Sequence, residues 1–113
     1  MAEVIQNLTC VADFDAVLKS AGSKPVIVDF TATWCGPCKA ISPFYHELAE
    51  QYSGKAIFCK CDVDAAQDLA LQEGITAMPT FKFYSKGVVA QEFRGANKDL
   101  LKSTCAAVVS KNA

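Results

Sequence analysis

The stretch VIVDFTATWCGPCK, residues 26–39, contains the transition on which the fold depends. Its first five residues form an apolar, mostly β-branched run without polar alternation, apart from Asp29, which is typical of a central strand covered on both faces. Cys35 and Cys38 follow where this strand ends and a long helical pattern begins. The stretch therefore predicts a buried strand that leads into a helix with a cysteine pair in its first turn.

Outward from this stretch, strand and helix patterns alternate without a linker or an internal repeat. Strands are predicted over residues 4–8, 26–30, 56–63, 80–84 and 88–93, and helices over 13–20, about 35–52, 64–73 and from 97 onward. Asp64 and Asn97 are predicted N-caps, and Gly74 is predicted to follow the third helix as its C′ residue. The last helix should bury Leu100 together with Leu101, Cys105 and Val108.

The spacing of these elements predicts how the strands pair. Helical crossovers early in the chain give parallel neighbours, and the short turn at residues 85–87 gives an antiparallel hairpin. Helices would then cover both faces of the sheet. The predicted fold class is α/β, a three-layer α/β/α sandwich with a central mixed sheet.

The composition indicates one globular domain, residues 1–113. The chain has 113 residues, 51% of them hydrophobic and 20% charged, with a formal net charge of −1. No basic cluster suggests a nucleic acid or an anionic membrane as a partner. The first residues lack a signal-peptide pattern, and no apolar run approaches the roughly 18 residues that span a bilayer. We therefore expect a cytoplasmic protein without a membrane segment.

Six cysteines could indicate a disulfide framework, but a chain of this size can fold without structural disulfides, and it shows no export signal. Reduced thiols are the better expectation. Four cysteines fall at apolar-patterned positions and should be buried small hydrophobes, although a regulatory redox role for them stays open: Cys10, Cys59, Cys61 and Cys105.

The remaining pair has the spacing of a redox site. Two residues between Cys35 and Cys38 let the first turn of a helix bring both sulfurs to bonding distance. Cys35 would lie at the N-cap or first position, where free N–H groups and the helix dipole stabilise a thiolate, and Cys38 would be more buried. Pro37 suits a first turn, where no backbone donor is missed. This arrangement predicts that the Cys35 thiolate attacks a target disulfide and forms a mixed disulfide with it. Cys38 would then attack Cys35 and release the reduced target.

Two other uses of the pair are weaker. Half of a zinc site is one, but Cys59 and Cys61 have C-x-C spacing rather than a second C-x-x-C. A cysteine protease is the other, but His46, the only histidine, lies about 16 Å along the same helix at about 1.5 Å per residue. No metal site and no glycine-rich phosphate loop is evident, so we expect no bound cofactor.

The sequence resembles the thioredoxin family over essentially its whole length. The resemblance rests on residues 28–39 (VDFTATWCGPCK), 62–64 (DVD), 78–80 (MPT) and 94–97 (RGAN), in this order and spacing. It implies a thioredoxin-like fold and a monomeric protein-disulfide reductase with a redox-active Cys35–Cys38 disulfide. It also implies an NADPH-dependent flavoprotein reductase as electron donor and disulfide-containing proteins as targets.

Asp29 interrupts the apolar run of the buried strand. A carboxylate there must be paired, hydrated, or protonated through a raised pKa. The resemblance assigns this position proton exchange with Cys38, and it places Lys60 near Asp29 as a possible modulator.

The resemblance further implies that Pro79 follows a cis peptide bond and faces the cysteine pair. The main chain of Met78 would then present its N–H and C=O groups to an extended substrate segment. A flat apolar surface would surround the pair, formed by Trp34, Gly36, Pro37, Ala77, Met78, Gly95 and Ala96.

Two alternative functions stay open on the same fold. One is a disulfide isomerase or oxidant, although the resemblance associates Gly36-Pro37 with reductants and a Gly-His pair with isomerases. The other is a non-catalytic binding module or chaperone, against which the presence of Cys35, Cys38, Asp29 and Pro79 argues.

Overall fold

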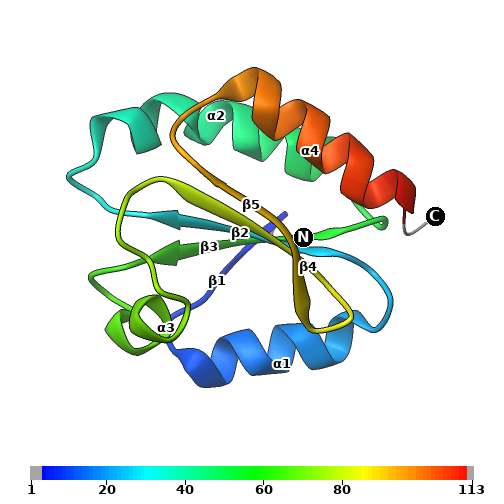
Figure 1. Ribbon diagram of the computed structural model, residues 1–113, viewed down its shortest axis with the longest axis horizontal. Helices are drawn as coiled ribbons and strands as arrows, with labels where there is room; N and C mark the ends of the chain where they lie inside the picture. Colours follow the sequence, from blue (N-terminus) through cyan, green and yellow to red (C-terminus); the bar gives the residue numbers. More distant parts are fainter. Residues whose placement is uncertain (1–3, 112–113) are drawn as a thin grey trace.

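The computed structural model describes residues 4–111, in which five strands form one sheet with helices on both faces (Figure 1). The elements in chain order are β1 (Ile5–Asn7), α1 (Val11–Ala21), β2 (Val26–Thr31), α2 (Gly36–Gln51), β3 (Ile57–Asp62), α3 (Gln67–Gln72), β4 (Thr80–Ser85), β5 (Val88–Arg94) and α4 (Lys98–Lys111). The predicted order of elements and the three-layer mixed sandwich are confirmed.

Strand β2 lies at the centre of the sheet, as its apolar pattern without polar alternation predicted. The strand order is β1-β3-β2-β4-β5, and all six residues of β2 are buried. β1, β3 and β2 run parallel, whereas β4 is antiparallel to both β2 and β5. The helical crossovers and the tight β4–β5 turn therefore give the pairing directions expected of them.

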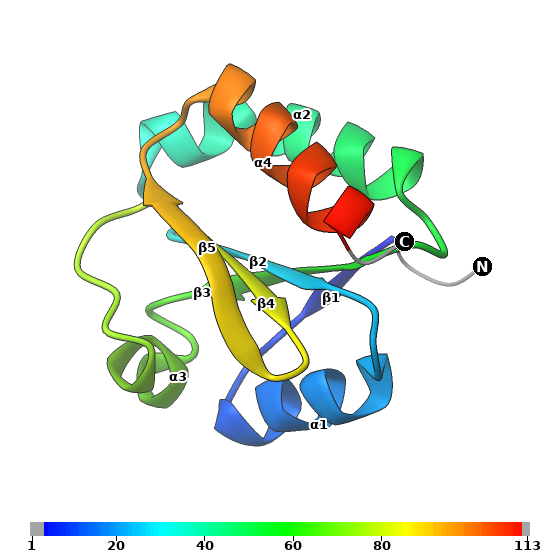
Figure 2. The same cartoon turned by 45° about the vertical axis from the view of Figure 1, so that its right-hand side comes forward.

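Two hydrophobic cores lie on opposite faces of the sheet. Helices α2 and α4 cover one face and α1 and α3 the other (Figure 2). Alternate residues of β2 enter different cores, with Ile27 packing beneath α2 and α4, and Val28 and Phe30 beneath α1 and α3. Each such fully buried side chain contributes about 1.5–3 kcal/mol to the free energy of unfolding.

Some predicted helix ends are confirmed and one is wrong. Asn97 Oδ1 accepts a hydrogen bond from the Leu100 N–H at 3.0 Å, as an N-cap does. Gly74 follows α3 with φ +68°, the left-handed C′ conformation. Asp64 is not an N-cap, because α3 begins only at Gln67 and its N-cap position is held by Ala66 without a side-chain cap.

The predicted apolar face of α4 also needs one correction. Leu101, Cys105 and Val108 are buried as expected, but Leu100 is 40% exposed. Leu100 is adjacent to Leu101 and is turned by about 100° from it around the helix, so both cannot point to the same core. No helix among residues 4–111 is long and apolar enough to cross a membrane.

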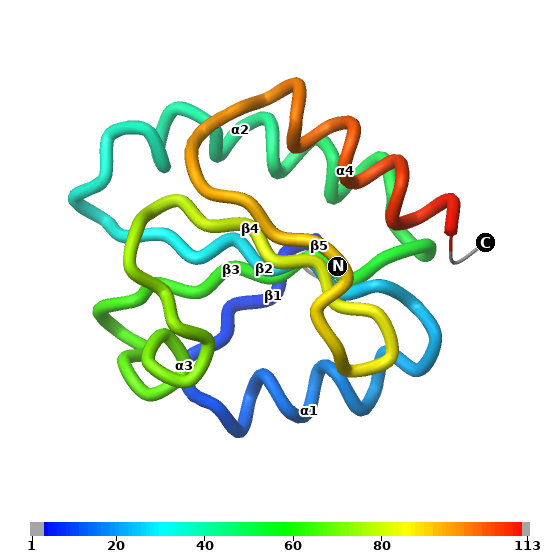
Figure 3. The backbone as a smooth tube through the Cα atoms, viewed as in Figure 1, coloured from blue at the N-terminus to red at the C-terminus, as the bar shows by residue number. Residues whose placement is uncertain are grey.

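The path of the chain brings two distant segments together at one end of the sheet (Figure 3). One is the turn between β2 and α2. The other is the segment between α3 and β4, which ends at the cis peptide bond between Met78 and Pro79. Their contact forms the site described next.

Candidate functional site

The cysteine pair lies at the N-terminal end of α2, as the sequence predicted. Cys35 is the N-cap residue of this helix, in extended backbone conformation, and Cys38 lies in its first turn. The two residues form a disulfide, with their Cα atoms 5.3 Å apart. The Cys38 N–H donates a hydrogen bond to Cys35 Sγ at 3.2 Å. An N–H aimed at this sulfur stabilises its thiolate when the disulfide is reduced.

The expected contrast in exposure between the two cysteines is small. Cys35 is 5% exposed and Cys38 is 2% exposed, so both are buried. Cys38 is the more buried of the two, as predicted, but the difference is slight because Met78 and Ala32 pack against the pair. What separates the two sulfurs is their neighbours, not their accessible area.

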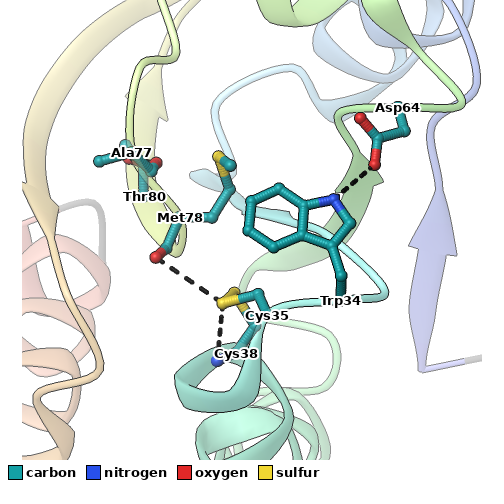
Figure 4. Close-up of a disulfide and its surroundings, with 7 residues drawn as sticks. All are labelled: Trp34, Cys35, Cys38, Asp64, Ala77, Met78 and Thr80. Carbon is teal, nitrogen blue, oxygen red and sulfur yellow. Dashed lines mark hydrogen bonds between the residues drawn. A yellow bond between two sulfur atoms is a disulfide. The ribbon is translucent and has the colours of Figure 1, made fainter.

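Trp34 forms one exposed wall beside the pair. Its side chain is 65% exposed, and its Nε1–H donates a hydrogen bond to Asp64 Oδ2 at 2.8 Å (Figure 4). This is the role that Asp64 has in place of the predicted helix cap. The bond fixes the indole beside Cys35 and leaves its face open to solvent. No local sequence signal pairs the two residues, which are thirty positions apart.

The Met78–Pro79 segment forms the opposite wall. The peptide bond is cis, which confirms the expectation for Pro79. The Met78 carbonyl oxygen lies 3.7 Å from Cys35 Sγ (Figure 4). The Ala77 carbonyl accepts a hydrogen bond from Thr80 Oγ1 at 2.6 Å, so the backbone before Met78 is held in place.

Four more residues were predicted to belong to the apolar surface around the pair, namely Gly36, Pro37, Gly95 and Ala96. The Gly95 N–H donates to the Pro79 carbonyl at 2.9 Å, and Gly95 has φ +98°, a conformation that favours glycine. Gly36 and Pro37 are exposed in the first turn of α2 between the cysteines. Ala96 is exposed directly after Gly95.

Asp29 is buried behind the pair. It is 2% exposed, and its Oδ1 has no hydrogen-bond partner among residues 4–111. Desolvation raises the pKa of Asp29 to about 7, and the positive charge of Lys60 lowers this pKa in part. Lys60 is the register neighbour of Asp29 on β3. Of the three conditions expected of a carboxylate in this strand, burial therefore favours the raised pKa.

A cavity of about 470 Å³ joins this carboxyl group to the resolving side of the pair. Asp29, Cys38 and Lys60 all line it, together with polar residues that include Thr31 and Asp62. The Asp29 carboxyl group and Cys38 therefore open on the same cavity, outside the packed core.

Three of the remaining cysteines are buried, and their thiols stay protonated. Cys59 and Cys61 lie in the core beneath α1 and α3, and Cys105 lies in the opposite core. Desolvation raises the pKa of each of these thiols to about 12, which leaves them neutral near pH 7. Cys10 differs from its predicted burial, since it is only half-buried at the N-cap position of α1.

These positions give a first testable prediction. Replacing Cys10 by Ser and Cys59, Cys61 and Cys105 by Ala should leave disulfide reductase activity within about twofold of the parent. Each lost buried sulfur should lower the free energy of unfolding by about 1 kcal/mol. Insulin reduction and urea unfolding measure the two effects. Loss of turnover in a folded variant would reveal a second redox pair and contradict this prediction.

The alternative uses of the pair find no support in the surrounding residues. His46 is exposed on α2, where its Nε2 lies 2.9 Å from Glu50 Oε1. Within residues 4–111, no group of three or more histidine, cysteine or acidic side chains is placed to hold a metal ion.

Comparison with known proteins gives one consistent result. The family model described as Thioredoxin matches residues 5–107. Thioredoxin from Gallus gallus is 49% identical over 106 residues, which cover 94% of this chain and 100% of that protein. Thioredoxin from Homo sapiens is 49% identical over 104 residues, covering 92% and 95%. The X-ray structure of Fasciola hepatica thioredoxin superimposes with a TM-score of 0.89 at 35% identity, covering 92% of this chain and 99% of that one.

Proposed function

Because this chain belongs to the thioredoxin family, we propose that its dithiol–disulfide exchange runs from Cys35 to Cys38 with Asp29 as proton acceptor. The protein is a dithiol–disulfide oxidoreductase that reduces disulfide bonds in other proteins. The observation that carries the proposal is the placement of Cys35 Sγ between the Cys38 N–H and the Met78 carbonyl.

The proposed reaction has two exchange steps. The Cys35 thiolate attacks one sulfur of the target disulfide, and the other target sulfur leaves as a thiolate. Cys38 then attacks Cys35 and releases the second target sulfur. The target disulfide gains two electrons, and the same two electrons are lost as the Cys35–Cys38 disulfide forms.

The second step needs a proton acceptor, because a buried thiol reacts only as its thiolate. Asp29 has a pKa of about 7 and opens on the same cavity as Cys38, so near neutrality its carboxylate can take the Cys38 proton. Lys60 favours the carboxylate form and thereby adjusts this pKa. The proton returns from Asp29 to Cys38 in the reverse reaction.

The target binds, in our proposal, over Cys35 between Trp34 and Met78, a surface that we call the substrate groove. An extended segment carrying the disulfide would pair with the free main-chain groups of Met78 as an added strand. The apolar rim of this groove supplies contact area that is independent of the target sequence. Its members are Trp34, Gly36, Pro37, Ala77, Met78, Pro79, Gly95 and Ala96.

Members of this family carry no bound cofactor, so the electrons for each cycle come from a thioredoxin reductase, and disulfide-containing proteins receive them. We further propose that the reductase is NADPH-dependent and that the protein acts as a monomer of one domain in the cytoplasm. The buried free thiols of Cys59, Cys61 and Cys105 favour a reducing compartment.

The direct test is insulin reduction by the parent protein with a thioredoxin reductase and NADPH. Sustained turnover is expected, and a Cys35→Ser control should lower it by about 100-fold or more, since a serine hydroxyl is a far weaker nucleophile than a thiolate. Binding of insulin without reduction would contradict the proposal and favour a binding module. Faster reshuffling of scrambled disulfides than net reduction would instead favour an isomerase.

A further inference from the structure

A buried lysine lies in the middle of β4, between two core phenylalanines. Lys82 is only 8% exposed. Its neighbours Phe81 and Phe83 are fully buried in the core under α2 and α4. Alternation along the strand turns Lys82 toward the other face of the sheet, on the side of α3. An ammonium group at such a position is costly unless it is paired and hydrogen-bonded.

The partners of Lys82 are oxygen atoms of two glutamates, Glu73 and Glu92. Lys82 Nζ donates a hydrogen bond to the main-chain carbonyl of Glu73 at 2.6 Å, and it lies 3.9 Å from Glu73 Oε1. Its third partner is Glu92 Oε2, at 3.7 Å on the neighbouring strand β5. The lysine therefore holds both the backbone and the side chain of Glu73.

Tyr84 holds the same glutamate from the next inward-facing position of β4. Its hydroxyl donates a hydrogen bond to Glu73 Oε1, and its side chain is 3% exposed. Burial and the Glu73 carboxylate both raise the pKa of Tyr84, so the hydroxyl stays a donor. Two residues of one strand thus fix one residue at the end of α3.

Glu73 matters because it begins the segment that leads to the substrate groove. It is the C-cap residue of α3, and Met78 follows five positions later. At its far end this segment is held by Thr80, which binds the Ala77 carbonyl, and by Gly95, which binds the Pro79 carbonyl. With both ends anchored, the Met78 carbonyl is kept opposite Cys35.

We propose that Lys82 and Tyr84 are positioning residues for protein substrates. By holding Glu73 they fix the near end of the α3–β4 segment, and through it the Met78 backbone that pairs with the target chain. This inference rests on the proposed function, because it assumes that targets dock on Met78. Neither residue contacts the reacting sulfurs, so the effect should appear in docking and not in the intrinsic reactivity of Cys35.

The test compares a protein disulfide with a small one. Lys82→Met and Tyr84→Phe should each lower kcat/KM for insulin by about five- to tenfold, chiefly through a higher KM, since each removes a hydrogen bond to Glu73. The rate with hydroxyethyl disulfide, which is too small to span the groove, should stay within about twofold. Amide hydrogens of residues 74–78 should exchange faster in both variants.

A matched control and a milder variant make the result decisive. Lys102→Met removes an exposed lysine from α4 and should leave both substrates unaffected. Tyr84→Phe deletes only a hydroxyl, so it decides the question if Lys82→Met does not fold. Equal losses with insulin and hydroxyethyl disulfide, or no loss with either, would overturn the proposal. Failure of the parent to reduce insulin would instead overturn the proposed function.

Discussion

Cys38→Ser protein added to a cell extract should accumulate covalent complexes with its targets, whereas Cys35→Ser protein should accumulate almost none. Attack on a target disulfide needs Cys35, and release of the target needs Cys38. With Cys38 removed, the mixed disulfide at Cys35 has no neighbouring thiol to resolve it. We expect the yield of complexes to differ by about 100-fold between the two variants, since serine barely replaces a thiolate nucleophile.

The surroundings of the two sulfurs explain why Cys35, and not Cys38, is the residue expected to capture targets. Cys35 Sγ lies next to the Met78 carbonyl, at the groove where a target would enter. Cys38 lies one turn into α2 and lines the cavity behind the pair together with Asp29. In our proposal a target disulfide therefore meets Cys35 at the groove, whereas Cys38 faces the cavity that Asp29 also lines.

Non-reducing gels followed by mass spectrometry of the retained bands measure the complexes. Treatment with a reductant should release every captured protein, and the double variant Cys35→Ser/Cys38→Ser should capture nothing through this site. Equal trapping by the two single variants would show that the roles of nucleophile and resolving thiol are assigned wrongly.

Asp29→Asn should slow disulfide turnover by about tenfold or more near pH 7, and by much less in alkaline solution. Asn keeps the shape of the side chain but cannot accept the proton that Cys38 must lose. At higher pH, Cys38 ionises without help, so the difference between variant and parent should narrow. Kinetics that match the parent from about pH 6 to about pH 9 would exclude proton exchange at Asp29.

The same substitution should change stability with a definite sign. The pKa of Asp29 is raised from 3.8 to about 7 in the folded protein, so folding favours the protonated form. Its contribution to stability is intact below about pH 4 and is lost as pH rises toward 7, after which the penalty is constant. A shift of this size corresponds to about 4 kcal/mol above pH 7.

Urea unfolding of the disulfide form measures this effect, because Cys38 does not titrate in that form. Asp29→Asn protein should match the parent at about pH 4 and exceed its free energy of unfolding by about 4 kcal/mol at about pH 8. Asp15→Asn is a suitable control, since it changes an exposed carboxylate on α1, far from the cysteine pair, and its difference from the parent should stay small at both pH values. A constant difference between Asp29→Asn and parent at all pH values would contradict a raised Asp29 pKa.

The sequence by itself determined those features that depend on neighbours along the chain. The apolar run of β2 predicted its central place, and the helical period of α4 predicted the burial of Leu101, Cys105 and Val108. The two-residue spacing of Cys35 and Cys38 set the geometry of the pair, because one helical turn brings such positions together. Asp29 stood out as a carboxyl group in an apolar strand, and its pKa is raised for that reason.

Only the tertiary structure decided which distant side chains meet. The strand order places Asp64 beside Trp34, a contact that no periodic pattern encodes. It also places Met78 beside Cys35, which the sequence indicated only through the family resemblance. Asp64 therefore binds the indole although its position suggested a helix cap, and Cys35 is buried because Met78 packs over it.

Asp29 and Lys82 show the same division most clearly. Both are charged residues within otherwise apolar strands, but only Asp29 stood out in the sequence. The structure leaves one carboxylate oxygen of Asp29 without a hydrogen-bond partner among residues 4–111, but surrounds Lys82 with the oxygens of Glu73 and Glu92. The cost of burying a charge is thus met by protonation at Asp29 and by pairing at Lys82, and the choice depends on which groups the fold brings within a few ångströms.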